Sequence, residues 1–226
     1  RGGFATHGLP RTPGGRRAGD SLDQAGIKSG GAAMRPAVAA DTGPDPATAA
    51  STARRLLSDD QVKILTAAYL SSFTLTVSTE AERAKIPLIT QSFADGLVTR
   101  GYKYTFKTTP LGTVFGSNTM SYNPDVLLDA KRSAIKKGSV VDGNDASAIT
   151  QAKGAVDDAT KYGFEITKNI SYPTNLTDAT SIVSQIRDTG AQIIFIGGGL
   201  GGVIQIPKGM RGGGITLPVV GVRGGG

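Results

Sequence analysis

Three hydroxyl side chains lie close together where a predicted strand gives way to a predicted helix: Ser71, Ser72 and Thr74. The first turn of a helix presents backbone N–H groups without partners inside the helix, and the helix dipole favours negative charge there. Amides joined by hydroxyls at such a point suit a carboxylate, so these residues are candidates for binding an anionic small molecule. The alternative is that a serine here only caps the helix, which is a common role for serine.

A second candidate binding motif is Gly197–Gly202, which has the G-x-G-x-x-G spacing of a dinucleotide-binding loop. It follows the predicted strand Ala191–Ile196, but the residues after it soon reach Pro207 and predict only a short, interrupted helix. No Asp or Glu follows Asp188, so the carboxylate that would bind the ribose is absent. An NAD(P)-dependent Rossmann oxidoreductase is therefore only an alternative, and no cofactor is expected.

The composition excludes several kinds of catalytic chemistry. The 226 residues include no Cys and a single His, His7, which argues against thiol nucleophiles, disulfides, thiolate or multi-histidine metal sites and a Ser-His-Asp triad. The net charge of +7 is spread thinly, without the basic face and interleaved aromatics of nucleic-acid binders, so no nucleic-acid partner is expected. No apolar run approaches the roughly 20 residues of a membrane span, and no signal peptide is recognisable.

The elements that must position these groups are predicted by short β-branched runs. Most of these runs are about 26 residues apart, which leaves room for a helix and two loops, as in a βαβ unit. Helices are predicted after Asp45, at Asn123-Pro124, and near Ser147 and Thr177. The fold class is therefore α/β, with parallel sheets flanked by helices. The predicted strands are 62–66, 87–90, 102–106, 139–142, 164–167, 191–196 and 217–221.

This pattern breaks between Phe106 and Ser139, where an irregular Pro/Gly-containing segment intervenes. Two βαβ arrays separated in this way predict two lobes, with the crossover near Thr109–Thr113. We expect a poorly defined Gly/Arg-rich leader without a recognisable strand at 1–35, a first lobe at 36–110 and a second, incomplete lobe at 111–226. Ligands of such sheets bind outside the carboxyl ends of the strands, so a cleft between the lobes is the expected site.

An ordered series of segments carries a resemblance to a known family: Asp41–Pro46, Tyr69–Thr74, Ala81–Ile89, Ser92–Asp95, Arg100–Pro110 and Tyr172–Ser181. In order and spacing, the chain from about Asp41 to Gly221 resembles the substrate-binding proteins of branched-chain amino-acid-type ABC transporters. The resemblance implies the type I periplasmic-binding-protein fold, with two Rossmann-like lobes. Members of this family are longer, so the chain is expected to be a C-terminally truncated fragment.

The resemblance also implies where a ligand binds. It places the carboxylate of an amino acid on Ser71 and Ser72, with Thr74 able to add a hydroxyl. It implies further contacts from the loop residues Ser92, Phe93 and Ala94, for which an ordinary polar loop is the alternative.

On the second lobe the resemblance points to Asp145 as the partner of an ammonium group, in a loop that lacks the family's aromatic residue. Capping of the following helix is the alternative role for Asp145, and Asp178 is expected to cap and orient its own helix. The Gly197–Gly202 loop would face the cleft without the aromatic contacts that relatives often carry there.

The implied function is non-enzymatic. The chain is expected to capture an amino acid, or a similar small carboxylate or amide, in an interlobe cleft that closes by hinge rotation, for uptake by an ABC transporter. The expected partners are this ligand and the membrane permease, the expected location is the periplasm or the extracellular face of the membrane, and a monomer is expected. A ligand sensor or regulator of the same fold, without transport, is the alternative.

Overall fold

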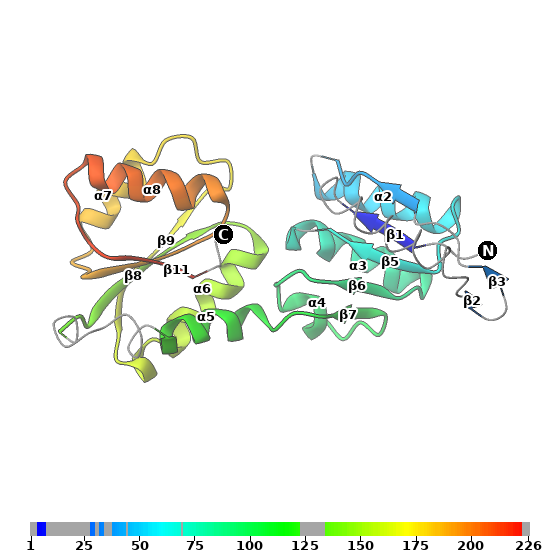
Figure 1. Cartoon of the computed structure of the whole chain (residues 1–226), viewed down its shortest axis with the longest axis horizontal. Helices are drawn as coiled ribbons and strands as arrows, with labels where there is room; N and C mark the ends of the chain where they lie inside the picture. Colours follow the sequence, from blue (N-terminus) through cyan, green and yellow to red (C-terminus); the bar gives the residue numbers. More distant parts are fainter. Residues whose placement is uncertain are drawn as a thin grey trace. The chain divides into compact units, whose positions relative to one another are not determined.

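The computed structural model describes residues 4–7, 28–29, 32–33, 38–43, 45–68, 70–122 and 134–222 (Figure 1). The chain divides into two compact units, Arg1–Thr109 and Pro110–Gly226. Both units are α/β, with parallel main sheets and helices packed on them, so the predicted fold class is confirmed. The predicted helix at Asn123-Pro124 lies outside the described residues.

The first unit is built on a parallel five-stranded sheet in the order β4-β1-β5-β6-β7. A short antiparallel pair, β2 and β3, accompanies it. Its strands are β1 (Phe4–His7), β2 (Lys28–Ser29), β3 (Ala32–Ala33), β4 (Val38–Ala40), β5 (Ile64–Ala67), β6 (Leu88–Thr90) and β7 (Thr105–Lys107), and its helices are α2 (Pro46–Ser58), α3 (Ser71–Ala84) and α4 (Gly96–Thr99).

The expectation that residues 1–35 hold no recognisable strand is wrong. Strand β1 lies inside the sheet, where Ala5 is in register with both Val38 of β4 and Leu65 of β5. Such a strand is defined by pairing with segments far away in the sequence, and a four-residue run among glycines and arginines carries little local signal of its own.

The core of the first unit forms where α2 and α3 bury their apolar faces together with Val62, Leu65 and Leu88. Helix α2 begins as predicted: Asp45 accepts a hydrogen bond from the Thr48 N–H at 2.8 Å, and Pro46 is the first helical residue. An N-cap and a proline at this point satisfy or remove N–H groups that would otherwise lack partners.

The second unit has a parallel four-stranded sheet in the order β11-β10-β8-β9. Its strands are β8 (Lys137–Gly143), β9 (Glu165–Tyr172), β10 (Ile193–Gly197) and β11 (Val219–Gly221), and its helices are α5 (Gly112–Tyr122), α6 (Ala146–Asp158), the 3-10 turn η2 (Thr160–Tyr162), α7 (Thr180–Arg187) and α8 (Leu200–Gly212).

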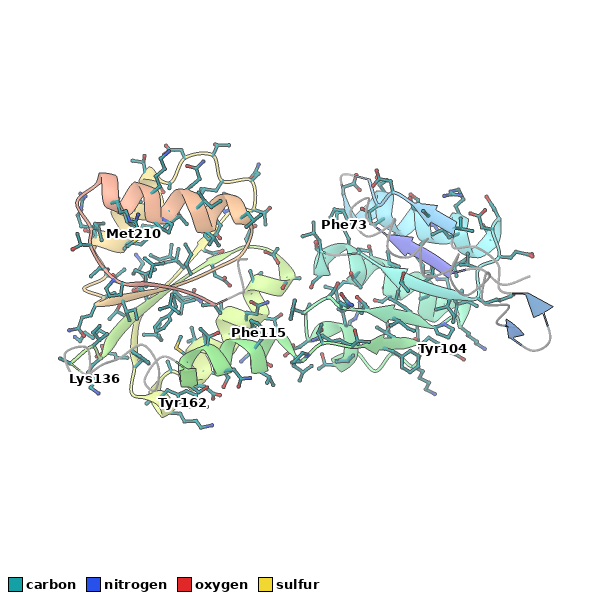
Figure 2. All side chains as sticks on the ribbon, viewed as in Figure 1. Phe73, Tyr104, Phe115, Lys136, Tyr162 and Met210 are labelled. Carbon is teal, nitrogen blue, oxygen red and sulfur yellow. The ribbon has the colours of Figure 1, made fainter. Side chains whose placement is uncertain are left out.

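Both faces of this second sheet are covered (Figure 2). Successive residues of a strand point to opposite faces. Accordingly, Val141 and Ile194 belong to the core under α7 and α8, which includes Met210, whereas Val140 and Phe195 belong to the core under α5 and α6. A sheet buried on both sides explains why β10 is apolar throughout.

Two helices of the second unit differ from the sequence predictions. Residues 112–122, expected to be irregular, form α5, which crosses α6 so closely that a β-carbon at Gly116 or Gly154 would overlap the backbone of the other helix. Helix α8 continues through Pro207, where a short, interrupted helix was expected, and Ile206 and Met210 on either side of the proline are buried. Tertiary packing outweighs weak local helix signals in both places.

Candidate functional site

The strongest candidate site lies at the carboxyl end of the first sheet, where Ser71 begins α3. Ser71 is only 2% exposed, and its Oγ accepts hydrogen bonds from the backbone N–H groups of Phe93 at 3.2 Å and Ala94 at 3.1 Å. The residue at the N-cap position is Leu70, which has an extended backbone and no capping side chain. The alternative interpretation of Ser71 as a simple N-cap is therefore wrong, because its hydroxyl binds the neighbouring loop instead.

The two bonds at Ser71 determine which part of its hydroxyl stays unused by the described residues. A serine hydroxyl has two acceptor lone pairs and one O–H donor, and both acceptor positions of Ser71 are taken by N–H groups. Among the residues that the structure describes, no acceptor for this O–H is recorded. A buried hydroxyl donor beside the N–H groups at the start of a 14-residue helix is suited to a carboxylate oxygen. The half-buried Ser72 is the next residue of the same turn.

Thr74 and Ser92 hydrogen-bond within the protein, next to Ser71. Their side-chain oxygens form a 2.7 Å hydrogen bond, each also lies within hydrogen-bond distance of the Ala68 carbonyl, and both residues are buried, Thr74 completely. This hydroxyl pair fastens the start of α3 to the loop after β6. Direct ligand contact by Thr74 or Ser92 stays a prediction, and their burial and internal bonds disfavour it.

The loop residues Phe93 and Ala94 use their backbone groups within the protein. Both N–H groups bind Ser71, while the Phe93 carbonyl accepts a hydrogen bond from Lys107 Nζ at 3.0 Å. The Ser92 carbonyl accepts from Thr109 Oγ1 at 3.3 Å. The expected direct contacts of this loop with a ligand remain untested, but the loop clearly fixes the position of Ser71.

Lys107 is a site residue that the sequence interpretation did not single out. It ends β7, and burial lowers the pKa of its ammonium group, while the nearby Asp95 carboxylate raises that pKa by a smaller amount. Lys107 could have been found from the sequence as a cationic residue at the carboxyl end of a predicted strand, because ligands of such sheets bind at that edge.

At the matching edge of the second unit, Asp145 caps α6. Its Oδ1 accepts hydrogen bonds from the N–H groups of Ser147 at 3.0 Å and Ala148 at 3.1 Å. The capping alternative is thus what the structure shows, while a second role as an ammonium partner stays a prediction. Asp178 likewise accepts from the Thr180 N–H at 2.9 Å and from its hydroxyl at 2.6 Å, and these bonds lower the pKa of its carboxyl.

Two glycines of the Gly197–Gly202 segment, Gly198 and Gly202, pack against Tyr172. The Tyr172 hydroxyl donates to the Gly197 carbonyl, and a β-carbon at Gly202 would overlap the tyrosine ring. Gly198 has φ +113°, which side chains rarely tolerate, and it also lies against Tyr172. Of the three glycines of the G-x-G-x-x-G spacing, Gly202 is thus required by the tyrosine ring, and a β-carbon at Gly197 would overlap the Asp142 carboxylate, whereas a β-carbon at Gly199 would have room.

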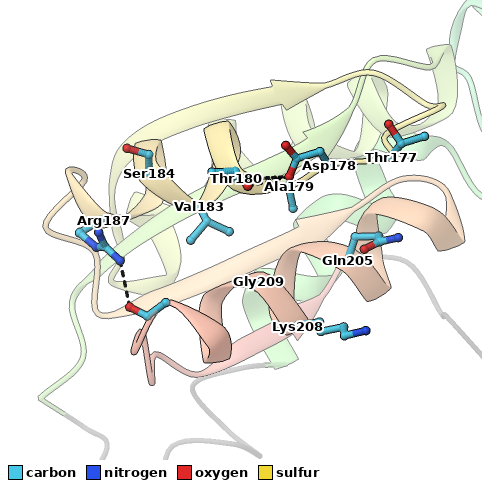
Figure 3. A pocket seen from close by; sticks show the side chains of 11 residues that line it. Thr177, Asp178, Ala179, Thr180, Val183, Ser184, Arg187, Gln205, Lys208 and Gly209 are labelled. Carbon is cyan, nitrogen blue, oxygen red and sulfur yellow. Dashed lines mark hydrogen bonds between the residues drawn. The ribbon is translucent and has the colours of Figure 1, made fainter.

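A separate groove of about 590 Å³ runs between α7 and α8 on the second unit (Figure 3). Arg187 donates to the Gly213 carbonyl at 2.9 Å at one end, and Asp178 lies toward the other. Its remaining lining includes Val183, Gln205 and Lys208. None of the residues predicted to bind ligand lines this groove.

Within the described part of the chain, no three acidic, histidine or cysteine side chains gather in a way that could hold a metal ion. No described helix has the length and apolar character needed to span a bilayer.

Comparison with known proteins gives concordant results. A family model described as periplasmic binding protein matches residues 28–226. The Leu/Ile/Val-binding protein homolog 8 of Brucella abortus is 29% identical over 150 residues, which cover 63% of this chain and 36% of that relative. The chain thus matches little more than a third of the length of this relative.

Two solved structures show the same fold. A leucine-binding protein from Thermotoga maritima superimposes with a TM-score of 0.81 and 18% identity, covering 98% of this chain and 63% of that chain. An ABC-transporter solute-binding protein from R. palustris, in complex with 4-hydroxybenzoate, gives a TM-score of 0.78 and 18% identity, covering 97% of this chain and 61% of that chain.

Proposed function

Because the chain belongs to the periplasmic binding protein family, we propose that it is a solute receptor that captures a small carboxylate, such as an amino acid, for uptake by an ABC transporter. This family consists of solute-binding proteins and not of enzymes. The oxidoreductase alternative built on Gly197–Gly202 is therefore discarded.

The observation that carries the proposal is the buried Ser71 hydroxyl. Two backbone N–H groups hold it in place at the first residue of α3, and none of the described residues accepts a hydrogen bond from its own O–H. Hydrogen bonds to an ionised group are stronger than neutral ones, so a carboxylate gains most from this donor and from the adjacent helix N-terminus.

The ligand class is supported by the relatives. The Thermotoga protein is named for leucine, and the R. palustris protein was solved with 4-hydroxybenzoate. These two molecules differ in almost every group except the carboxylate. Both ligands could therefore place their carboxylate at the same site of the first unit, while the rest of the ligand differs from one relative to the next. Which carboxylate this chain prefers depends on other residues, among which Asp145 is our candidate for an ammonium group.

The proposed partners follow from the family. They are the small-molecule ligand and the membrane permease of the transporter, with the receptor in the periplasm or at the extracellular face. A cleft between the two lobes that closes on the ligand remains a prediction, as does a monomeric state. A sensor or regulator that binds the same ligand without delivering it to a transporter remains the alternative, and transport assays with the permease would separate the two.

The experiment is a thermal-shift screen of the 226-residue chain with amino acids, amides, short and aromatic carboxylates, urea and NAD. A ligand present at 100 times its Kd should stabilise the protein by about 2.7 kcal/mol. The proposal expects a shift with at least one carboxylate and none with NAD. A thermal shift with NAD, together with no shift from any carboxylate, would overturn the proposal.

The Ser71→Ala variant tests the site within this screen. It should cut the stabilisation caused by the carboxylate to about half, as a tenfold loss of affinity implies, whereas the exposed control Ser58→Ala on α2 should keep it. An undiminished shift in Ser71→Ala would place the carboxylate elsewhere in the molecule.

A further inference from the structure

We propose that Lys107 is a positioning residue that makes the first unit selective for anionic ligands by acting through the Phe93–Ala94 peptide group on the Ser71 hydroxyl. The inference rests on the proposed function, because it assigns the charge that supports the carboxylate subsite. It concerns described residues of the first unit alone.

The geometry that carries the proposal is a continuous chain of hydrogen bonds. Lys107 Nζ donates to the Phe93 carbonyl at 3.0 Å, and the N–H of the same peptide group, which belongs to Ala94, donates to Ser71 Oγ at 3.1 Å. One planar peptide group therefore joins the ammonium group to the hydroxyl that is left to donate.

The sheet register explains why Lys107 reaches this loop. Lys107 is directly opposite Thr90, the last residue of β6, in the parallel pair β6–β7. The loop that contains Phe93 and Ala94 begins just after Thr90, so the lysine side chain at the end of β7 lies beside it. A change of register by one residue would turn this side chain to the other face of the sheet.

The hydrogen-bond chain has a physical consequence for a ligand. A charged donor polarises the peptide group that accepts from it, and each polarised group is a stronger donor to the next. The Ser71 O–H at the end of the chain is therefore a better donor when Lys107 is charged. Such a donor favours a carboxylate over a neutral carboxamide, because the amide oxygen carries less charge.

The surroundings of Lys107 also favour an anionic ligand. Its ammonium group is partly buried, and this burial lowers its pKa, with Asp95 as the opposing charge nearby. A partly desolvated cation gains when an anion arrives in its neighbourhood. Carboxylate binding should therefore favour the protonated form of Lys107, an effect that a neutral ligand would not produce.

The binding experiment compares two ligand pairs in which an uncharged carboxamide replaces the carboxylate: L-leucine with L-leucinamide, and 4-hydroxybenzoate with 4-hydroxybenzamide. Calorimetric titrations are made on the wild-type chain, on Lys107→Met, and on Lys103→Met, a control that removes an exposed lysine two residues before β7. We expect Lys107→Met to weaken carboxylate binding about tenfold, because the charged donor that polarises the Phe93–Ala94 peptide group is lost. The carboxamides should change less than about threefold.

Lys107→Arg should recover most of the carboxylate affinity, because it keeps the charge at the same strand end. An equal loss for carboxylate and carboxamide in Lys107→Met would overturn the proposal, since it would show that Lys107 only braces the loop. An equal loss of carboxylate affinity in Lys103→Met and Lys107→Met would also overturn it, because the loss would then follow from the lower net charge of the protein and not from the position of Lys107.

A measurement without ligand keeps the two proposals separable. In ¹H–¹⁵N spectra, Lys107→Met should shift the Ala94 amide proton upfield, as expected for a weakened hydrogen bond to Ser71, and Lys103→Met should not. If the wild-type chain binds no carboxylate, the proposed function fails, while a shifted Ala94 amide still supports the link between Lys107 and Ser71. An unshifted amide overturns that link whatever the ligand result.

Discussion

The carboxyl edges of the two sheets contain similar polar residues but use them differently. At the first edge, Ser71 is held by two N–H groups, and its own O–H has no acceptor among the residues that the structure describes. At the second edge, one carboxylate oxygen of Asp145 accepts the N–H groups at the start of α6. The Tyr172 hydroxyl donates to the Gly197 carbonyl at the same edge. The first edge is the one at which we propose that an anion binds, whereas the polar groups of the second edge are bonded within the protein.

This difference shows why the type and position of a polar residue do not define a ligand site. Ser71 and Asp145 both lie close to the start of a helix that follows a strand. Only the partners of each side chain determine whether a donor or acceptor is left over for a ligand.

The largest expected effect concerns the closed edge of the second unit. Gly202→Ala should lower the free energy of unfolding by about 2 kcal/mol, because the added β-carbon overlaps the buried Tyr172 ring. The control is Gly212→Ala at the end of the same helix, where no heavy atom lies within 4 Å of an added β-carbon. Urea denaturation measures both, and equal stabilities would show that this edge is not closed by Tyr172.

The open edge of the first unit should respond in both stability and binding. Ser71→Ala removes the acceptor of the Ala94 N–H, so a loss of about 1.5 kcal/mol in unfolding free energy is expected. Carboxylate affinity should fall about tenfold in addition, since an interaction with a charged group is lost. Calorimetry on protein shown to be folded by circular dichroism separates the two effects, and a change in stability alone would make Ser71 purely structural.

The cap of α6 gives a smaller effect on stability. Asp145→Ala should destabilise the protein by about 1 kcal/mol, because two N–H groups at the start of the helix lose their acceptor. Urea denaturation is again the measurement. A loss of less than about 0.3 kcal/mol would mean that the cap is replaced by water without penalty.

The smallest effect on stability separates the two roles considered for Asp145. Asp145→Asn keeps a side-chain oxygen for the cap and removes only the negative charge, so stability should change by no more than a few tenths of a kcal/mol. If Asp145 binds an ammonium group, leucine affinity should fall while 4-hydroxybenzoate affinity stays constant. Equal affinities of the variant and the wild-type chain for leucine would leave capping as the role of Asp145.

Much of the fold could be predicted from sequence because the signals were local. Runs such as Ala191–Ile196 matched strand β10, and Asp45-Pro46 marked the start of α2. Helix α5 could not be predicted in this way, since glycine and polar residues give it little intrinsic helix preference. It forms against α6, where Gly116 and Gly154 let the two backbones approach closely.

The candidate site was predictable only in outline. Ser71 was placed correctly at the start of a helix after a strand, because hydroxyl residues at such a junction have a recognisable pattern. The internal roles of Thr74 and Ser92, and the presence of Lys107, were not predictable, because they depend on hydrogen bonds between segments 14 to 24 residues apart.

The sequence by itself determined the α/β alternation, the absence of thiol and histidine chemistry, and the hydroxyl cluster at the start of α3. These follow from composition and local periodicity, which need no knowledge of distant contacts. The tertiary structure alone decided that the Ser71 hydroxyl accepts two loop N–H groups, that Lys107 reaches the Phe93 carbonyl, and that Tyr172 requires glycine at positions 198 and 202. Each of these depends on register and close packing between separate segments, which local sequence does not encode.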